Sequence, residues 1–337
     1  HRADGRARPS SCSPGGDMRA AVQDTYGPPS VVSVREVPDP RPGDGELLVK
    51  VDATSVNRTD CGFRAASPPL VRLFSGLRRP KRPTLGNEFA GVVVEVGSGV
   101  TQFEVGARIF GYIEGPFGGH AEYLTVNENA SIAVTPPHVA QEVAAVGTEG
   151  SHYALAFTTA AAIGPGMDVM VYGATGAIGS AAVQIAKHLG AAVTGVCATE
   201  HLELVSRLGA DRVVDYLTGD FTVDDQSYDV VLDAVGKSSW GACKPLLKSD
   251  GLYMSSELGR LAQNPLLAIS TRFSRGRRVK FPVPKHDQAM IEHLGELMAA
   301  GAFVPVVDRT FTLDQIVEAY EYVETGQKVG NVVITIA

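Results

Sequence analysis

The sequence has few cysteines and no long apolar run. Its four cysteines, Cys12, Cys61, Cys197 and Cys243, are scattered among 337 residues and form no C-x-x-C pair. This pattern excludes a disulfide framework and a structural zinc site built on paired cysteines. No apolar stretch approaches the roughly 18 residues that a transmembrane helix needs. We therefore predict a cytoplasmic protein that does not span a membrane.

An excess of positive charge is also missing. The formal net charge is −7, which argues against binding to nucleic acid or to an anionic membrane surface. The arginine-rich residues 72–82 are a local exception, which we interpret as a solvated loop rather than a binding patch. Residues 1–17 are polar and lack the apolar segment of a signal peptide. We expect them to be a disordered leader or a cloning artefact, with the native chain beginning near Met18.

Residues 169–190 carry the clearest motif. The apolar residues 169–172 predict a buried parallel strand, a glycine-rich turn follows, and apolar residues then recur at helical spacing up to Gly190. Strand, glycine turn and helix are the context of a dinucleotide-binding fingerprint, in which helix N–H groups hold a pyrophosphate. The middle glycine of G-x-G-x-x-G is replaced here, so a tight turn in another doubly wound sheet is the alternative. The predicted cofactor-binding residues of this turn are Gly173, Ala174, Thr175, Gly176, Ala177 and Ile178.

The pattern of the chain changes near residue 140, and the length favours two domains. Before it, short strands punctuated by glycine turns suggest a small barrel. After it, strands alternate with helices, which predicts a parallel sheet of six strands. The barrel strands are expected at 47–53, 88–96, 107–113 and 121–126, and the parallel strands at 169–172, 191–197, 212–216, 229–233, 252–255 and 279–283. Helices are expected at 200–208, 240–247, 287–300 and 313–323, and a last strand at 332–336 should rejoin the first domain.

Several motifs together resemble the medium-chain dehydrogenase/reductase superfamily, specifically its zinc-independent quinone oxidoreductase-like branch. The motifs are VKVDATSVNRTD at 49–60, PTLGNEFAGVVVEVGSGVTQFEVGARIFG at 83–111, VYGATGAIGSAAVQIAKHLGA at 171–191, LGADRVVDY at 208–216, YDVVLDAVG at 228–236 and GQKVGNVVI at 326–334. The resemblance implies an α/β fold, namely a Rossmann doubly wound parallel sheet plus a discontinuous GroES-like β-barrel domain. Residues 18–140 and 287–337 would form the GroES-like catalytic domain and residues 141–286 the Rossmann domain, with a substrate cleft between them.

The zinc ligands of related alcohol dehydrogenases are not matched in this chain. Asn57 stands where their first cysteine would be, and Asn87 replaces the histidine of their Gly-His-Glu motif. No cysteine occurs at 147–153, where the third ligand is expected, and the four-cysteine lobe is also missing. Zinc prefers thiolate, neutral imidazole or carboxylate ligands. We therefore predict a protein that binds no metal.

Without a metal ion, reduction of a conjugated carbonyl is easier than oxidation of an alcohol, because hydrogen-bond donors can stabilise the developing oxyanion. The resemblance makes Asn57 the first catalytic candidate and Thr59, at the hydroxyl position of the proton relay, the second. Asp60 is equally well explained as a helix cap or a structural ion pair. Water is an alternative proton source, and the candidate protein donors are Tyr112, Tyr123, Tyr153 and His152, each of which is individually better explained as a core residue.

The choice between NADH and NADPH depends on the end of the second parallel strand. An acid there would bind the ribose of NAD, but the strand ends in Ala198 and Thr199. The resemblance instead assigns the 2′-phosphate of NADPH to Thr199, His201 and Tyr216, and it adds Asn331 to the cofactor-binding residues. His201 replaces the usual lysine or arginine and follows acidic Glu200, so we predict NADPH with NADH as the alternative.

The predicted function is reduction of a quinone or an α,β-unsaturated carbonyl by NAD(P)H without zinc. A non-catalytic NADPH-binding regulatory or structural protein is the alternative, and an alcohol dehydrogenase is a weaker one. The substrate would be a small molecule bound by residues 63–74, 112–119 and 258–274. We expect no nucleic-acid or membrane partner, and a homodimer paired through the strand near 279–283.

Overall fold

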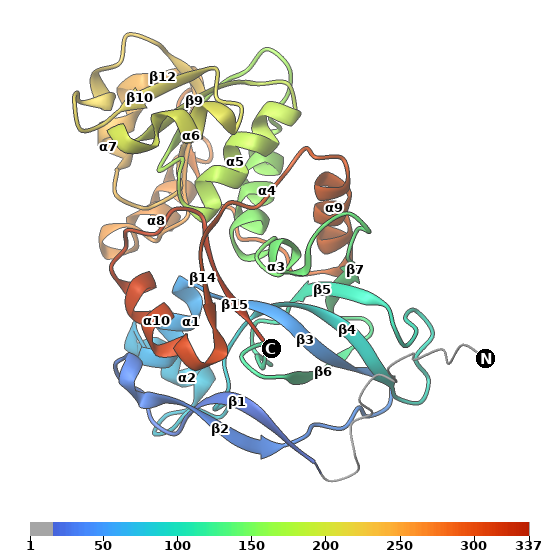
Figure 1. Ribbon diagram of the computed structural model, residues 1–337. Coiled ribbons are helices and arrows are strands. Elements are labelled where there is room, and N and C mark those ends of the chain that lie inside the picture. Colours follow the sequence, from blue (N-terminus) through green and yellow to red (C-terminus); the bar gives the residue numbers. More distant parts are fainter. Residues whose placement is uncertain (1–15, 337) are drawn as a thin grey trace.

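The computed structural model describes residues 16–336 and contains three sheets (Figure 1). A six-stranded sheet and its helices occupy one end of the molecule, and a seven-stranded sheet occupies the other. A two-stranded ribbon, β1 (Asp17–Gln23) and β2 (Val32–Pro38), lies along the far side of the second sheet. Residues 1–15 of the expected leader lie outside the described residues, whereas Asp17 already belongs to β1.

The six-stranded sheet is parallel throughout, as predicted. Its strands run in the order β10-β9-β8-β11-β12-β13. From β8 the chain first adds β9 and β10 on one side, and it then returns to the other side of β8 to add β11, β12 and β13, so the order of the strands reverses between β8 and β11. This is the order of a dinucleotide-binding sheet, and the reversal is where ligands bind in such sheets. The strands are β8 (Asp168–Tyr172), β9 (Ala192–Cys197), β10 (Arg212–Asp215), β11 (Tyr228–Asp233), β12 (Leu247–Ser255) and β13 (Arg278–Lys280).

The apolar strands of this sheet are buried because helices cover both faces. Val171 of β8 and Leu232 of β11 are both fully buried. The helices of this half are α5 (Ala177–His188), α6 (Leu202–Arg207), α7 (Trp240–Cys243) and α8 (Gln263–Ser270), with single 3-10 turns η3 (Thr199–His201), η4 (Phe221–Val223), η5 (Lys244–Leu246) and η6 (Arg260–Ala262). β13 is shorter than the predicted strand at 279–283 and lies at the sheet edge, and pairing there across a dimer axis stays a prediction.

Helix α4 (Glu149–Ala161) was not anticipated from the sequence. Its buried residues 150, 154, 157, 158 and 161 recur at helical spacing on one face. Glycine and threonine occur on that face, while Leu155 and alanines occur on the rest of the helix, so the sequence shows only a weak amphipathic stripe. It packs against α5, and Gly150 allows the close approach, because a Cβ there would lie 2.6 Å from the Ala177 carbonyl carbon. The N-terminus of α4 thereby lies beside the N-terminus of α5.

The seven-stranded sheet joins segments from both ends of the chain. Its order is β14-β15-β3-β4-β5-β7, and β6 also pairs with β3. The last strand, β15, pairs antiparallel with β3, which is the return to the first part of the chain that the sequence predicted. The strands are β3 (Glu46–Val56), β4 (Glu88–Val96), β5 (Arg108–Tyr112), β6 (Tyr123–Asn127), β7 (Ser131–Val134), β14 (Val307–Thr312) and β15 (Asn331–Thr335).

Helices also occur in the region that the sequence suggested to be entirely β. α1 (Arg58–Ala65) and α2 (Arg72–Ser75) interrupt it, and α1 begins with a capping box between Asn57 and Asp60. The other helices are α3 (Gln141–Ala144), α9 (Gln288–Ala299) and α10 (Ile316–Glu324), with 3-10 turns η1 (Pro29–Val31), η2 (Pro69–Val71) and η7 (Leu313–Gln315). α9 packs against β7. The domain boundaries near 140 and 286 stay predictions.

None of the helices within residues 16–336 combines the length and the hydropathy needed to cross a membrane.

Candidate functional site

The turn between β8 and α5 has the geometry that a pyrophosphate requires. Gly173 adopts a positive φ of 80°, and a Cβ at this position would lie 2.5 Å from Cγ1 of Val235. A Cβ at Gly179 would lie 2.0 Å from the Gly173 carbonyl oxygen, so only glycine lets the helix approach the strand. Gly176 precedes α5 and supplies no side-chain cap. The first N–H groups of α5 therefore have no side-chain acceptor, and the turn fits a phosphate group.

A small cleft of about 160 Å³ runs from this turn to the first helix of the other half. Its walls come from the end of the glycine turn, from the carboxyl ends of β11 and β12, from the N-termini of α1 and α4, and from the segment before β15. The lining residues used below are Asn57, Glu149, Gly176, Ala177, Ile178, Lys328 and Asn331.

The segment before β15 is attached directly to the fingerprint turn. The Gly330 N–H donates to the Thr175 carbonyl oxygen over 2.7 Å, and Gly176 and Gly330 form an isolated parallel bridge. Asn331 is buried, and its Nδ2 donates to the Val306 carbonyl oxygen over 3.1 Å. The structure thus places Asn331 beside the predicted cofactor turn, which the sequence alone could not show. Ala174, by contrast, is fully buried in the core.

The three residues predicted to hold a 2′-phosphate lie beside carboxylates. Thr199 Oγ1 donates to Asp215 Oδ2 over 2.6 Å, and this bond is the main reason that the pKa of Asp215 lies below its ordinary value. His201 Nε2 lies 3.2 Å from Glu200 Oε1. Tyr216 is 43% exposed, and its ring meets the Tyr172 ring edge-on. Asp215 was not considered from the sequence, and it introduces a negative charge next to Thr199.

Asn57 and Asn87 form a hydrogen-bonded pair. Asn57 Nδ2 donates to Asn87 Oδ1 over 2.6 Å and to Ser55 Oγ over 3.2 Å, while its Oδ1 accepts from the Asp60 N–H. Both amide hydrogens of Asn57 are therefore used inside the protein, which departs from its expected role as a free donor to substrate. Asp60 is fully buried and caps α1, which favours the structural explanation for it.

The two amides do not fit a zinc ion. Each is neutral, and the oxygen of Asn87 that faces Asn57 already accepts a hydrogen bond. Within residues 16–336, no three His, Cys, Asp or Glu side chains are grouped so that they could hold a metal ion.

Glu149 is the central acidic residue of the site, and the sequence analysis missed it. Thr59 Oγ1 donates to Glu149 Oε1 over 2.6 Å, and Asn87 Nδ2 donates to Glu149 Oε2 over 3.2 Å. Burial raises the pKa of Glu149 to about 7, and the charge of Glu88 acts in the same direction. The available signal was an acid at the start of a helix, but that helix was itself not predicted from the sequence.

Glu88 fixes Glu149 in place. The Glu88 side chain is fully buried, and its Oε2 accepts from Ser55 Oγ over 2.6 Å. Its Oε1 accepts from the N–H and Oγ1 of Thr148 and from the Glu149 N–H over 2.5 Å. One carboxylate on β4 thus holds the N-terminus of α4 against the seven-stranded sheet.

Tyr112 connects Glu149 with a second carboxylate. Its hydroxyl donates to Glu114 Oε2 over 2.6 Å, and the phenol also interacts with Glu149. Burial raises the pKa of this phenol well above its ordinary value. The Tyr112 ring stacks on His286 with centroids 4.8 Å apart and meets His152 edge-on at 4.9 Å.

The remaining candidate proton donors are less suited to that role. Burial lowers the pKa of His152 to about 3, so its imidazole is neutral, and its Nδ1 lies 3.0 Å from the Thr148 carbonyl oxygen. Burial raises the pKa of Tyr153 to about 12. Tyr123 lies on β6, where it pairs with Lys50 of β3.

Lys328 is a cation in the cleft that the sequence analysis did not single out. Its Nζ donates to the Gly330 carbonyl oxygen over 2.5 Å. Burial lowers the pKa of Lys328, although the charges of Glu88, Asp308 and Glu149 oppose this shift. Its only sequence signal was its position two residues before Gly330 in the C-terminal motif.

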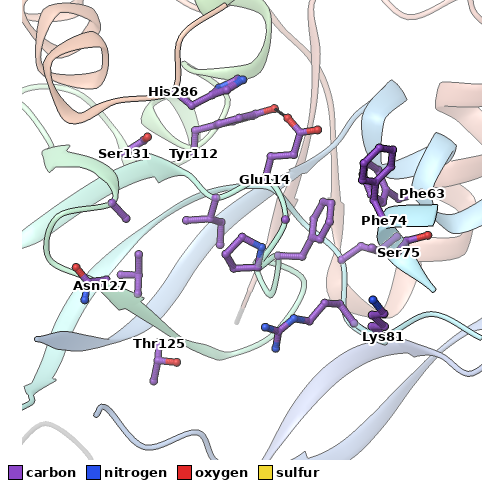
Figure 2. Close-up of a pocket in the computed structure, with 18 of the residues that line it drawn as sticks. Phe63, Phe74, Ser75, Lys81, Tyr112, Glu114, Thr125, Asn127, Ser131 and His286 are labelled. Carbon is purple, nitrogen blue, oxygen red and sulfur yellow. Dashed lines mark hydrogen bonds between the residues drawn. The ribbon is translucent and has the colours of Figure 1, made fainter. Parts of the chain in front are cut away.

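A larger cavity of about 810 Å³ lies on the other side of Tyr112. Figure 2 shows Tyr112, Glu114 and His286 at the top of the cavity in this view and Phe63 and Phe74 at its right side. The cavity includes residues from two of the three expected substrate segments, 63–74 and 112–119. Of the described residues 258–274, none lines it, so that part of the expectation does not apply to this cavity.

Two family models match two separate parts of the chain. Residues 43–137 match the alcohol dehydrogenase GroES-like domain, and residues 208–334 match the zinc-binding dehydrogenase family.

Individual relatives extend over nearly the whole chain. A chloroplastic quinone oxidoreductase QR1 of Triphysaria versicolor is 30% identical over 329 residues, which cover 94% of this chain and 98% of that protein. A chloroplastic NADPH-dependent alkenal/one oxidoreductase of Arabidopsis thaliana is 29% identical and covers 94% of this chain and 79% of its own length. The solved structure of a quinone oxidoreductase from Coxiella burnetii superposes with a TM-score of 0.85 at 25% identity, covering 95% of this chain and 100% of that one.

Proposed function

The chain belongs to the medium-chain dehydrogenase/reductase superfamily, in its quinone oxidoreductase-like branch, and on that basis we propose that it is a zinc-independent reductase. It would transfer a hydride from NADPH, or from NADH, to a quinone or an α,β-unsaturated carbonyl compound. Relatives named quinone oxidoreductase, alkenal/one oxidoreductase and 2-methylene-furan-3-one reductase support this class of substrate.

One observation carries the proposal. Asn57, Asn87 and Glu149 form a bonded group at the end of the cleft that begins at the fingerprint turn. A bound nicotinamide dinucleotide would supply the hydride, and this group would face the acceptor. Neutral amides and a carboxyl group can donate or move protons, but they lack the thiolate and imidazole ligands of a zinc site. Conjugated acceptors suit such a site because their reduction needs charge stabilisation rather than a strong Lewis acid.

The large cavity beside Tyr112 supports an apolar or aromatic acceptor. Phe63 and Phe117 meet edge-on with centroids 4.8 Å apart, and Tyr112 and His286 present stacked rings to the same cavity. Aromatic walls favour planar, conjugated rings, which bury apolar area against them. A quinone or a cyclic enone matches this lining better than a small aliphatic aldehyde.

NADPH is the cofactor that we expect to be preferred. No acid ends β9 to receive the ribose hydroxyls of NADH, and Thr199, His201 and Tyr216 lie in the region expected for the 2′-phosphate. The carboxylates of Asp215 and Glu200 repel the negative phosphate. Asp215 accepts a hydrogen bond from Thr199, and Glu200 lies beside His201. The expected preference is therefore modest, with NADH also accepted.

A non-catalytic cofactor-binding protein is the second candidate, because both Asn57 amide hydrogens already have acceptors inside the protein. The test is to follow nicotinamide absorbance with NADPH and NADH against a p-quinone, an ortho-quinone, a 2-alkenal, a cyclic enone and a saturated aldehyde. Turnover with conjugated acceptors alone supports the reductase. Cofactor binding without turnover supports the binding protein, and turnover with the saturated aldehyde alone contradicts both.

A further inference from the structure

We propose that Glu149 is the catalytic acid that protonates the reduced acceptor, and that Tyr112 and Glu114 return a proton to it from solvent. This inference rests on the proposed reductase function and names the group that completes the reaction. It assigns a role to a residue outside the fingerprint, in the segment 147–153 where related alcohol dehydrogenases would place a third zinc ligand.

Tyr112 lies between two carboxyl groups. The phenol has one hydrogen, and it donates that hydrogen to Glu114 over 2.6 Å. Glu149 interacts with the same phenol from the other side. A proton on one of the two carboxyl groups would therefore complete a chain of groups from Glu149 through Tyr112 to Glu114.

Burial decides which carboxyl group holds this proton. Glu114 is exposed, so water can solvate its charge, whereas Glu149 is partly buried and faces the buried Glu88. Burial and the Glu88 charge raise the pKa of Glu149 to about 7, close to the value at which a side chain both holds and releases a proton.

The charged and titratable groups that surround Glu149 come from every neighbouring element. Acidic groups outnumber basic ones among them. These groups are Glu88 on β4, Asp60 and Arg58 on α1, Tyr112 and Glu114 at the end of β5, Tyr153 on α4 and Lys328 before β15.

Glu149 lies where the proton is needed. It lines the same small cleft as Ala177 and Ile178 of the fingerprint turn, and it is the neighbour of Asn57 there. Thr59 Oγ1, 2.6 Å from Glu149 Oε1, keeps one carboxyl oxygen oriented, so Thr59 acts as a positioning residue. Tyr112 and Glu114 also line the large cavity, which gives the other side of the carboxyl group a connection to solvent (Figure 2).

The reaction balances with these groups. The β-carbon of the enone gains the hydride, and the electrons of its C=C bond move to the carbonyl oxygen to give an enolate. The O–H bond of Glu149 then breaks, its proton bonds to the α-carbon, and the electron pair stays on the carboxylate. Glu114 takes up the next proton from solvent hydronium or buffer. The Tyr112 hydroxyl gives its hydrogen to the Glu149 carboxylate and receives the proton from Glu114, so all three groups return to their starting states. For a quinone, the same proton would go to the phenolate oxygen.

The test compares wild type with Glu149→Gln, which keeps the shape of the side chain. Glu104→Gln is the matched control, because Glu104 is exposed and lines neither the cleft nor the large cavity. We expect Glu149→Gln to lower kcat about 100-fold, the lower range for loss of a general acid, with cofactor affinity unchanged. Glu104→Gln should leave kcat unchanged. Equal kcat for wild type and Glu149→Gln would overturn the inference.

A second readout does not depend on turnover. The infrared difference between wild type and Glu149→Gln at pH 6 should contain the carbonyl band of a protonated carboxylic acid, and this band should disappear by pH 8. Absence of the band would overturn the inference even if the enzyme is active. A wild type that shows the band but reduces no acceptor would overturn the proposed function, and the donor role with it.

Tyr112→Phe is a second variant, which tests the proton relay even if Glu149→Gln does not fold. The first turnover should be as fast as in wild type, because Glu149 enters the reaction already protonated. Later turnovers should be slower, because the route for the next proton is lost. Equal slowing of the first and later turnovers would contradict the relay.

Discussion

Asn57 and Asn87 share a 2.6 Å hydrogen bond at the two positions where related alcohol dehydrogenases place zinc ligands. The bond connects the N-terminus of α1 with the start of β4, and through Asn87 Nδ2 it reaches Glu149. The amide pair therefore has a structural role, because it connects α1, β4 and α4 at the end of the cofactor cleft.

Replacing Asn87 should destabilise the fold. Asn87→Leu keeps the approximate shape of the side chain. It removes the acceptor of the Asn57 Nδ2 hydrogen and the donor to Glu149 Oε2, in the interior of the protein. We expect a loss of about 1–3 kcal/mol in the free energy of unfolding, as for other buried polar groups left unpaired, measured by urea denaturation. Asn129→Leu, at an exposed position, should change it by less than about 0.5 kcal/mol. Equal losses for both variants would contradict this account.

Metal removal should leave the activity intact. The amides cannot supply the anionic or imidazole ligands that zinc requires. Treatment with a strong chelator should therefore change kcat by less than about twofold, within the error of such comparisons. Loss of activity on chelation, with recovery on adding zinc, would contradict the prediction that this site works without zinc.

The pH dependence should follow Glu149. A donor must carry its proton, and the pKa of this group is raised to about 7 by burial. The rate of acceptor reduction should therefore be high below this pH and decline as the pH rises through it. In Glu149→Gln the decline should vanish, since the titrating group is gone. A wild-type rate that instead rises across neutral pH would indicate a general base.

Cofactor preference should respond to Asp215. Its carboxylate accepts from Thr199 Oγ1 and lies in the region expected for a 2′-phosphate. Asp215→Asn removes that negative charge, so NADPH should bind severalfold more tightly relative to NADH, as measured by fluorescence titration. Asp225→Asn makes the same change of charge at another exposed site and should leave the ratio unchanged. If both variants shift the ratio equally, the effect is one of overall charge.

Cofactor binding should also depend on the absence of a side chain at Gly179. A Cβ there would meet the Gly173 carbonyl oxygen at 2.0 Å, which forces the turn apart. Gly179→Ala should weaken binding of either dinucleotide by more than about tenfold, given the 1–3 kcal/mol typical of overpacking. At Gly219 a Cβ would have no neighbour within 4 Å, so Gly219→Ala should bind normally.

Local patterns were enough to predict the six parallel strands. Residues 169–172 and 229–233 are short apolar runs, and burial on both sheet faces requires such runs in a parallel sheet. α4 was missed because its buried face contains glycine and threonine while its other face contains leucine and alanine, so the sequence shows little contrast between the two faces. α1 was missed although Asn57 and Asp60 have the spacing of a capping box.

The site could be predicted only where one segment supplies the chemistry. The fingerprint turn is contiguous, and its glycines indicate their own function. Glu149 depends on contacts with Thr59 and Glu88, which lie far from it in the sequence, so no local pattern indicates its environment. The carboxylate beside Thr199 was missed for the same reason, since Asp215 comes from the next strand.

The hydrogen bond from Gly330 to Thr175 has a consequence for the order of synthesis. The fingerprint turn is synthesised before its partner segment, because Thr175 precedes Gly330 in the chain. The cleft therefore lacks one wall until residues 326–331 have been made and β15 has paired with β3. A translation product that stops before this segment would lack a complete cofactor site.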